Sequence, residues 1–203
     1  MLLRLFKNDH DAPAFQGVAG ERVYIRPPEK TDGAAWIALK TRNHDFLKPW
    51  SPSRAMMNID RDGFLNRLNT YQQDWKDGRA FAFFIFRDDT DELIGGLSLN
   101  NVVRAAAQSA MVGYWLDEGN TRQGYMTEAL LLACHFAFRT LKLHRVEAGT
   151  LPENIASQKV LNNCGFLLEG YRRKYLKIAG EWRDHLIFSM LSEEFISLGG
   201  PAS

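Results

Sequence analysis

Apolar and polar positions follow one another in short runs that predict seven β-strands. Residues 23–27 are β-branched and aromatic and stop at a proline. Residues 80–86 are almost wholly apolar, as in a strand buried on both faces. The glycine pair Gly95–Gly96 in the following run indicates a bulge or the close approach of another group. The remaining predicted strands are residues 93–103, 110–117 and 144–151, and a hairpin of residues 166–178 and 181–191 turning at Ala179–Gly180.

Apolar positions three and four apart predict helices between these strands. One predicted helix runs from Gly33 to about Arg42 with Asp32 as its cap, and another runs from Arg61 to about Lys76 and ends at Gly78. Two more follow Gly124 and Asn154, and residues 47–53, with two prolines, are expected to be a loop. The order β–α–α–β–β–β–α–β–α–β–β predicts a mixed α/β domain rather than an alternating dinucleotide-binding fold.

Length and charge narrow the possible functions. The chain of 203 residues is 45% hydrophobic and 12% aromatic, which predicts a single domain over residues 1–203 with a sizeable core. Lys and Arg total 25 and Asp and Glu total 24, for a net charge of +1. A dedicated nucleic-acid binder would be more basic, so we expect no direct nucleic-acid partner.

The cysteines and the N-terminal run indicate the expected compartment. Cys134 and Cys164 lie in apolar helical contexts without a CxxC motif or a Cys/His cluster, so free buried thiols and no metal site are predicted. The apolar run at residues 1–11 is short and interrupted by charges, unlike a signal peptide. No window has the ~18 apolar residues of a membrane span. These features predict a soluble, cytoplasmic protein.

Gly124 stands where a loop gives way to an apolar helix. A helix start has unpaired N–H groups and a partial positive charge, so an anion such as a pyrophosphate is a natural partner, and a glycine lets it approach the backbone. An ordinary turn is the alternative reading of this glycine alone. The sequence has neither the P-loop lysine nor the GxGxxG fingerprint, which disfavours a nucleoside triphosphatase or a dehydrogenase.

The segment around Gly124 resembles motif A of the GCN5-related N-acetyltransferases (GNAT), R/Q-x-x-G-x-G/A. The aligned run is Thr121-Arg122-Gln123-Gly124-Tyr125-Met126, in which Gly124 matches and Thr121 and Met126 depart from the pattern. The similarity extends over roughly residues 22–191 and is strongest to the RimJ/RimL ribosomal-protein-alanine acetyltransferases, RimJ in particular. The segments that carry this finer resemblance are "FLKPWSP", "NNVVR", "HR" and "GEWRDH".

The resemblance implies a GNAT fold and an acetyl-CoA site. The expected sheet is mixed, mostly antiparallel and about seven-stranded, flanked by helices, with the family's fourth and fifth strands splayed and a bulge freeing backbone groups for the pantetheine arm. The side chains of Tyr114 and Trp115 are expected to pack in the core. The implied cofactor-binding residues are Trp115, Leu116, Arg122, Gln123, Gly124, Tyr125, Met126, Thr127, Asn154 and Ser157.

The family transfers acetyl directly to an amine, which assigns two catalytic roles by resemblance. Ser157 matches a position that protonates the leaving thiolate in RimL-like enzymes, and Asn154 is both a cofactor contact and a helix N-cap. Glu147, or else Glu169, is the candidate base, because the RimL-like base position falls on Leu176. The histidines are expected to be structural.

The expected acceptor is the α-amine of a protein that begins with Ala or Ser, in particular a ribosomal protein. Trp50 and Tyr175, and also Trp182, are expected to line a groove for a small first side chain. Acetylation of a small amine and a non-catalytic CoA-binding regulator are the alternatives. The protein is expected to be a monomer or a homodimer.

Overall fold

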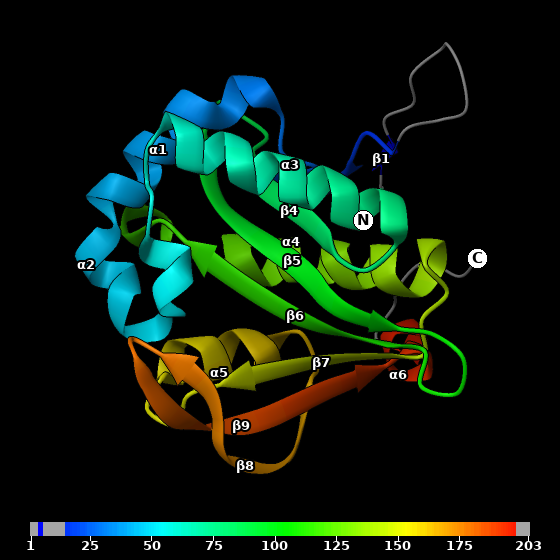
Figure 1. The fold of residues 1–203 in the computed structure, drawn as a ribbon. Helices are drawn as coiled ribbons and strands as arrows, with labels where there is room; N and C mark the ends of the chain where they lie inside the picture. The colour runs from blue at the N-terminus through cyan, green and yellow to red at the C-terminus, as the bar shows by residue number, and fades with distance from the viewer. Residues whose placement is uncertain (1–3, 6–14, 198–203) are drawn as a thin grey trace.

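All the strands that the structure describes form one nine-stranded sheet. The structure is a computed structural model that describes residues 4–5 and 15–197. The sheet order is β1-β2-β3-β4-β5-β6-β7-β9-β8, and neighbouring strands are antiparallel except for β6 and β7, which are parallel (Figure 1). The strands are β1 (Arg4–Leu5), β2 (Val18–Ala19), β3 (Val23–Arg26), β4 (Phe81–Arg87), β5 (Leu93–Val103), β6 (Ser109–Leu116), β7 (Arg145–Thr150), β8 (Leu167–Ile178) and β9 (Glu181–Leu191).

The seven strands predicted from the sequence are all present, as β3 to β9. The two extra strands, β1 and β2, have two residues each and extend the sheet beyond β3. Most of the N-terminal run at residues 1–11 lies outside the described residues.

Helices cover both faces of the sheet. On one face α1 and α3 pack on the even-numbered side chains of β4, and Trp36 and Phe64 meet Phe84 there. On the other face α4 packs on the odd-numbered ones, represented by Phe83, so β4 is buried on both faces as predicted. The helices are α1 (Gly33–Arg42), α2 (His44–Leu47), α3 (Arg61–Asp77), α4 (Tyr125–His135), α5 (Ile155–Asn163) and α6 (Ser192–Ser197), with a π-helical turn, η5 (Phe136–Thr140), after α4.

Two predicted helix boundaries are confirmed, and two local predictions are wrong. The carboxylate of Asp60 caps α3 by accepting the N–H of Gly63 at 2.7 Å, and Gly78 ends it with φ +67°. Asp32 does not cap α1 with its side chain, because its carboxylate pairs with Arg26 at 2.6 Å instead. The segment expected to be a loop forms the end of α2 and the short 3-10 helices η2 (Lys48–Trp50) and η3 (Ser53–Met56).

The glycine pair on β5 leaves room for a tryptophan side chain from the neighbouring strand. The register of β4 and β5 shifts between Ile85 and Phe86, beside Gly95, so the predicted bulge is present. A Cβ on Gly96 would lie 2.8 Å from Nε1 of Trp115 on the neighbouring strand. The predicted close approach is therefore made by the indole ring of Trp115, which needs a residue without a side chain opposite it.

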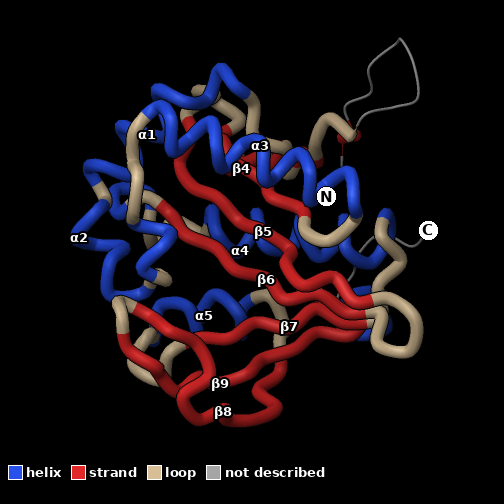
Figure 2. The backbone as a smooth tube through the Cα atoms, in the orientation of Figure 1, coloured by secondary structure: helices blue, strands red, loops and turns tan. Residues whose placement is uncertain are grey.

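The parallel strands β6 and β7 separate along their length. Their pairing runs from Ser109 opposite Arg145 to Val112 opposite Ala148 and then stops, and the two strands diverge beyond it (Figure 2). The pairing of β6 with β5 continues without a shift from Met111 to Leu116. The splay expected from the family resemblance is confirmed, but the expected bulge in β6 is not present, and the splay alone leaves β6 without a strand partner on its β7 side.

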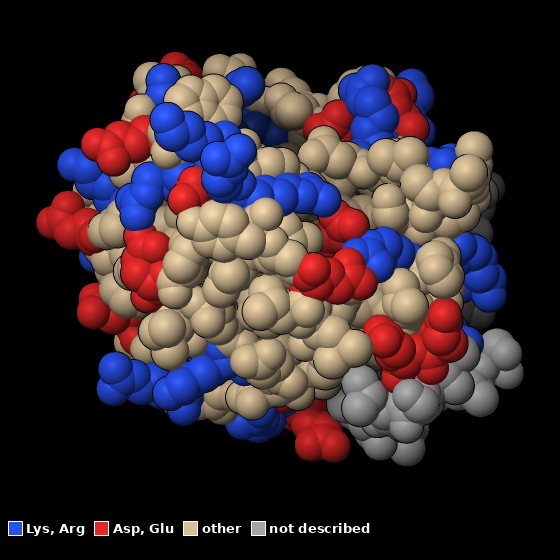
Figure 3. All heavy atoms as spheres, turned by 90° about the horizontal axis from the view of Figure 1, so that it is seen from below, with Lys and Arg blue, Asp and Glu red and all other residues tan. Residues whose placement is uncertain are grey.

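The β8–β9 hairpin forms the end of the sheet farthest from the N-terminal strands. It turns at Ala179 and Gly180, which both have positive φ, as the predicted two-residue turn requires. Leu167, Leu168 and Tyr171 of β8 are exposed. Seen from this side of the molecule, uncharged atoms form a broad area with Lys, Arg, Asp and Glu around it (Figure 3).

Candidate active site

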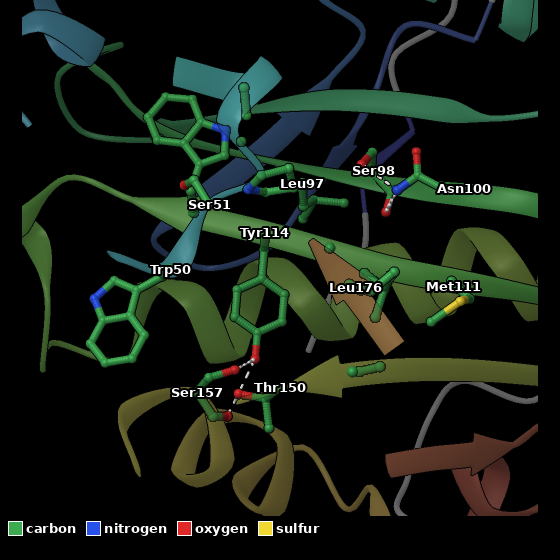
Figure 4. Close-up of a pocket in the computed structure, with 18 of the residues that line it drawn as sticks. Trp50, Ser51, Leu97, Ser98, Asn100, Met111, Tyr114, Thr150, Ser157 and Leu176 are labelled. Atoms are coloured by element: carbon green, nitrogen blue, oxygen red, sulfur yellow. Dashed lines mark hydrogen bonds between the residues drawn. The ribbon is translucent and has the colours of Figure 1, made fainter. Parts of the chain in front are cut away.

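A cavity of about 470 Å³ opens where β6 and β7 part. Its wall is formed by strands β4 to β9, α1, α3, the start of α5 and the segment of η2 that holds Trp50 (Figure 4). Of the residues assigned by resemblance, the cavity is lined by Trp50, Trp115, Asn154, Ser157 and Tyr175. The structure thus brings the expected catalytic serine and the expected acceptor residues into one space.

Ser157 is held by a short chain of hydrogen bonds. Tyr114 reaches from β6 toward α5, where its hydroxyl lies 2.8 Å from Oγ of Ser157 (Figure 4). The side chain of Asn154 accepts the N–H of Ser157 at 3.1 Å, which confirms Asn154 as the N-cap of α5. Burial raises the pKa of Tyr114, so the phenol stays protonated and can donate a hydrogen bond. The expectation that Tyr114 only packs in the core missed this contact.

Successive side chains of β6 point to opposite faces of the sheet. Tyr114 and Leu116 pack on the side of α4, whereas Trp115 packs on the side of α1 and α3. The cavity contains residues from both sides, so it crosses the sheet through the gap between β6 and β7. Two reactants can therefore meet in it from opposite faces.

The walls of the gap fit the arm of a coenzyme A molecule. From Gly113 onward β6 has no strand partner on its β7 side, and peptide groups left free in this way can pair with an amide-containing chain. Oγ1 of Thr150, at the end of β7, is buried and has no hydrogen-bond partner among the described residues. These groups supply both donors and acceptors to a ligand that enters between the strands.

A short segment connects the end of β6 at Leu116 to the start of α4 at Tyr125. Gly124 precedes the helix with φ +83°, and no side chain caps it. A Cβ on Gly124 would lie 3.0 Å from the guanidinium of Arg22. The sequence interpretation gave Gly124 the role of clearing a path for an anion; in the structure, its backbone angle and the nearness of Arg22 are what require glycine.

Arg22 ties this loop to the sheet, a role that the sequence analysis missed. Its Nη1 donates to the carbonyl oxygen of Gln123 at 2.8 Å, and its Nε pairs with Glu128 at 3.1 Å. Glu128 also accepts the backbone N–H groups of Glu21 and Arg22. The charge of Arg22 is therefore paired with Glu128, and the groups at this helix start that favour an anion are its unpaired backbone N–H groups.

Neither predicted base lines the cavity. The carboxylate of Glu147 lies 2.8 Å from Nε of Arg145 and 3.7 Å from Arg172, and Glu169 is bound by the same Arg145. Carboxylates held by guanidinium groups are poor proton acceptors. The structure gives these two residues a place in an ion-pair network, so we do not retain either as the base.

His185, expected to be structural, lies in the cavity wall instead. Its Nδ1 is 3.0 Å from the carbonyl oxygen of Arg183. Because a carbonyl only accepts, Nδ1 carries the proton and Nε2 keeps a lone pair. Burial lowers the pKa of His185, which favours this neutral form. Its strand position gave no signal of this role, since the cavity beside it is formed with Gly149 of β7 and Tyr175 of β8, which are distant in the sequence.

Bulky side chains narrow the cavity on the side where Trp50 and Tyr175 lie. Trp50 is partly exposed, and Leu176 adds an apolar surface (Figure 4). The hydroxyl of Tyr175 donates a hydrogen bond to Sδ of Met111 at 3.1 Å. The backbone N–H of Ala179 donates to the carbonyl oxygen of Ser51 at 3.0 Å, so the hairpin meets the end of η2 beside the cavity. Trp182 does not line the cavity; it is 60% exposed on β9.

The described residues contain neither a group of metal ligands nor a membrane-spanning helix. Across residues 4–5 and 15–197, no three His, Cys, Asp or Glu side chains form a group that could hold a metal ion. Within the same residues, no helix is long and apolar enough to cross a bilayer. Cys134 and Cys164 are both buried free thiols, as predicted.

Known proteins are similar to this chain in sequence and in fold. A family model described as an acetyltransferase (GNAT) domain matches residues 22–167. The Bacillus subtilis protein named "Probable N-acetyltransferase YjcK" is 39% identical over 175 residues, covering 86% of this chain and 97% of that protein. The Escherichia coli [ribosomal protein uS5]-alanine N-acetyltransferase is 33% identical, covering 86% of this chain and 90% of that protein.

Solved structures agree with these relatives. Mycobacterium smegmatis RimJ in complex with CoA-disulfide superposes with a TM-score of 0.80 at 30% identity, covering 87% of this chain and 89% of that one. The Vibrio fischeri ribosomal-protein-S5-alanine acetyltransferase gives a TM-score of 0.81 at 30% identity, covering 88% and 98%. The chain therefore belongs to the GNAT family, as an N-acetyltransferase whose relatives include the RimJ and RimL ribosomal-protein acetyltransferases.

Proposed function

We propose that this enzyme transfers acetyl from acetyl-CoA to the N-terminal α-amine of a protein that begins with Ala or Ser, with a ribosomal protein as the expected acceptor. The supporting observation is the cavity at the splay, which is open to both faces of the sheet and narrowed on the acceptor side by Trp50 and Tyr175. Relatives that act on the alanine of uS5 support the same acceptor class.

The cavity suits an α-amine better than a lysine side chain. Among its described lining residues there is no Asp or Glu to serve as a strong base. An α-amine has a pKa of about 7.7–8.0 and a lysine about 10.4, so the neutral fraction near pH 7 is roughly 200 to 400 times larger for the α-amine. A weak base is then sufficient, and we propose Nε2 of His185 for it.

In the proposed reaction the amine nitrogen attacks the thioester carbonyl, the C–N bond forms and the C–S bond breaks. Ser157 donates a proton to the leaving sulfur and regains one from water, and its hydroxyl is aligned by Tyr114. His185 accepts the proton that the amine loses, directly or through a water. The proposed cofactor contacts are the backbone of Trp115 and Leu116, Asn154, and the helix start from Arg122 to Thr127, where the pyrophosphate would be held.

A peptide panel tests this proposal. Peptides that differ only in a first residue of Ala, Ser or Met are incubated with acetyl-CoA and read by mass spectrometry. The expected result is one acetyl group on the α-amine of the Ala and Ser peptides and slower reaction of the Met peptide. Acetylation of small amines with no reaction of any peptide would replace this proposal with the small-amine alternative.

A further inference from the structure

Lys40 of α1 is a buried cation that has no carboxylate partner among residues 4–5 and 15–197. It is 4% exposed, and its Nζ lies 4.3 Å from the ring centroid of Trp115 and 3.9 Å from Sδ of Met56. Both contacts are weak substitutes for water around an ammonium group. Burial, and after it the charge of Arg67, lowers the pKa of Lys40 to about 8.

Arg67 of α3 adds a second positive charge at the same place. Its Nη2 donates to the carbonyl oxygens of Arg54 and Met57, at 2.8 Å each, and its guanidinium lies over the ring of Trp36. Lys40 and Arg67 both line the cavity, and the described lining has no acidic side chain to offset them. This part of the wall therefore has an uncompensated positive charge.

The two cations lie on the acceptor side of the cavity. They pack with Trp36 and Trp115 on the face of α1 and α3, whereas Tyr114 and Ser157 mark the α4 and α5 face on which the leaving thiol is expected. The uncapped start of α4, with Arg22 beside it, is the separate place proposed for the pyrophosphate. Lys40 is thus placed to meet the acceptor rather than the phosphates of the cofactor.

A buried charge is costly unless an opposite charge joins it. An acceptor that brings a carboxylate would therefore bind better than one with a neutral group of the same shape. We propose that Lys40, with Arg67 beside it, binds an acidic side chain at the second or third residue of the acceptor peptide, so that the enzyme selects acidic N-termini. This inference rests on the proposed α-amine acetylation.

The first test changes the peptide and leaves the enzyme intact. Four peptides begin Ala-Glu-Gly, Ala-Gln-Gly, Ala-Gly-Glu and Ala-Gly-Gln and are otherwise identical. A charge-assisted hydrogen bond predicts that the better Glu peptide has a KM roughly tenfold below that of its Gln partner. Equal KM values within both pairs, with all four peptides acetylated, would overturn the inference while leaving the proposed function intact.

The second test changes the enzyme. Lys40→Met keeps an unbranched apolar chain and removes the charge, and Lys48→Met, at an exposed lysine nearby, is the matched control. The preference for Glu should disappear in Lys40→Met and remain in Lys48→Met. A preference for Glu over Gln that persists in Lys40→Met would show that Lys40 does not bind the acidic side chain of the peptide. A higher acetyl-CoA Kd with unchanged peptide selectivity would show the same.

A third test asks whether the anion that meets Lys40 belongs to a peptide or to a small anionic amine. O-phosphoethanolamine, a small anionic amine, is offered in place of a peptide. A kcat/KM below that of the Glu peptides supports a peptide carboxylate. A higher kcat/KM would overturn the peptide assignment. No acetylation of any peptide would instead be a failure of the proposed function.

Discussion

The pairing of Ser157 with Tyr114 makes a quantitative prediction about turnover. The variants are Ser157→Ala, Tyr114→Phe and the double mutant. The hydroxyls lie 2.8 Å apart, and the phenol can donate to Oγ of Ser157 while the serine hydrogen is directed at the leaving sulfur. Both variants remove a hydroxyl and leave the remaining side chain in place.

The expected losses differ because one partner meets a developing charge and the other does not. A hydrogen bond to a charged group is worth about 1.5–3 kcal/mol, so Ser157→Ala should lower kcat about 10- to 150-fold. A neutral hydrogen bond is worth about 0.5–1.5 kcal/mol, so Tyr114→Phe should lower kcat about 2- to 12-fold. Since Tyr114 acts through Ser157, the double mutant should resemble Ser157→Ala alone.

Steady-state kinetics with a thiol-detecting reagent measure these values, and a titration of acetyl-CoA checks that its Kd changes little. Interactions made mainly in the transition state appear in kcat. A normal kcat for Ser157→Ala would reduce Ser157 to a helix residue. Fully additive losses in the double mutant would show that Tyr114 does not work through the serine.

Three further predictions concern the cofactor loop, the start of α5 and the pH dependence of folding. Gly124→Val should raise the acetyl-CoA Kd, because a β-branched residue at φ +83° costs about 1–2 kcal/mol of backbone strain and would crowd Arg22. The control variant Gly170→Ala, with open space around it, should leave the Kd unchanged. Equal Kd values for the two variants in calorimetry would contradict this prediction. Asn154→Ala should lower the free energy of unfolding in urea by about 0.5–2 kcal/mol through loss of the N-cap, and an unchanged midpoint would argue against it. Burial lowers the pKa of His185 below its unfolded value of about 6.5, so the contribution of His185 to stability is present above that pH and is lost as the pH falls. The wild-type protein should therefore lose more free energy of unfolding than His185→Gln between pH 7 and pH 5. Parallel curves of unfolding free energy against pH for the two proteins would contradict this prediction.

The sheet was predictable because its information is local. Each of the seven predicted strands has its own run of apolar residues and its own turn residues, such as Ala179–Gly180 or the proline after Arg26. The cap at Asp60 and the stop at Gly78 are also local signals. The short helices around Trp50 were missed because prolines indicate a break but do not distinguish a loop from single helical turns.

The site was predictable only where family motifs lie in continuous sequence. Ser157 and Asn154 belong to such a motif, and they line the cavity. Lys40 was missed because its burial depends on Trp115, 75 positions away, and His185 because the cavity wall around it comes from other strands. The sequence places Arg145 on the same strand face as Glu147, so this ion pair is a local feature, whereas the second arginine, Arg172, comes from β8.

The central claim is that the acceptor is an α-amine. The most direct test is a competition for acetyl-CoA between an Ala-starting peptide with blocked lysines and an N-terminally blocked peptide with free lysines, followed by mass spectrometry. We predict acetylation of the free α-amine and little reaction at lysine. Acetylation of the lysine peptide at an equal or greater rate would contradict the claim.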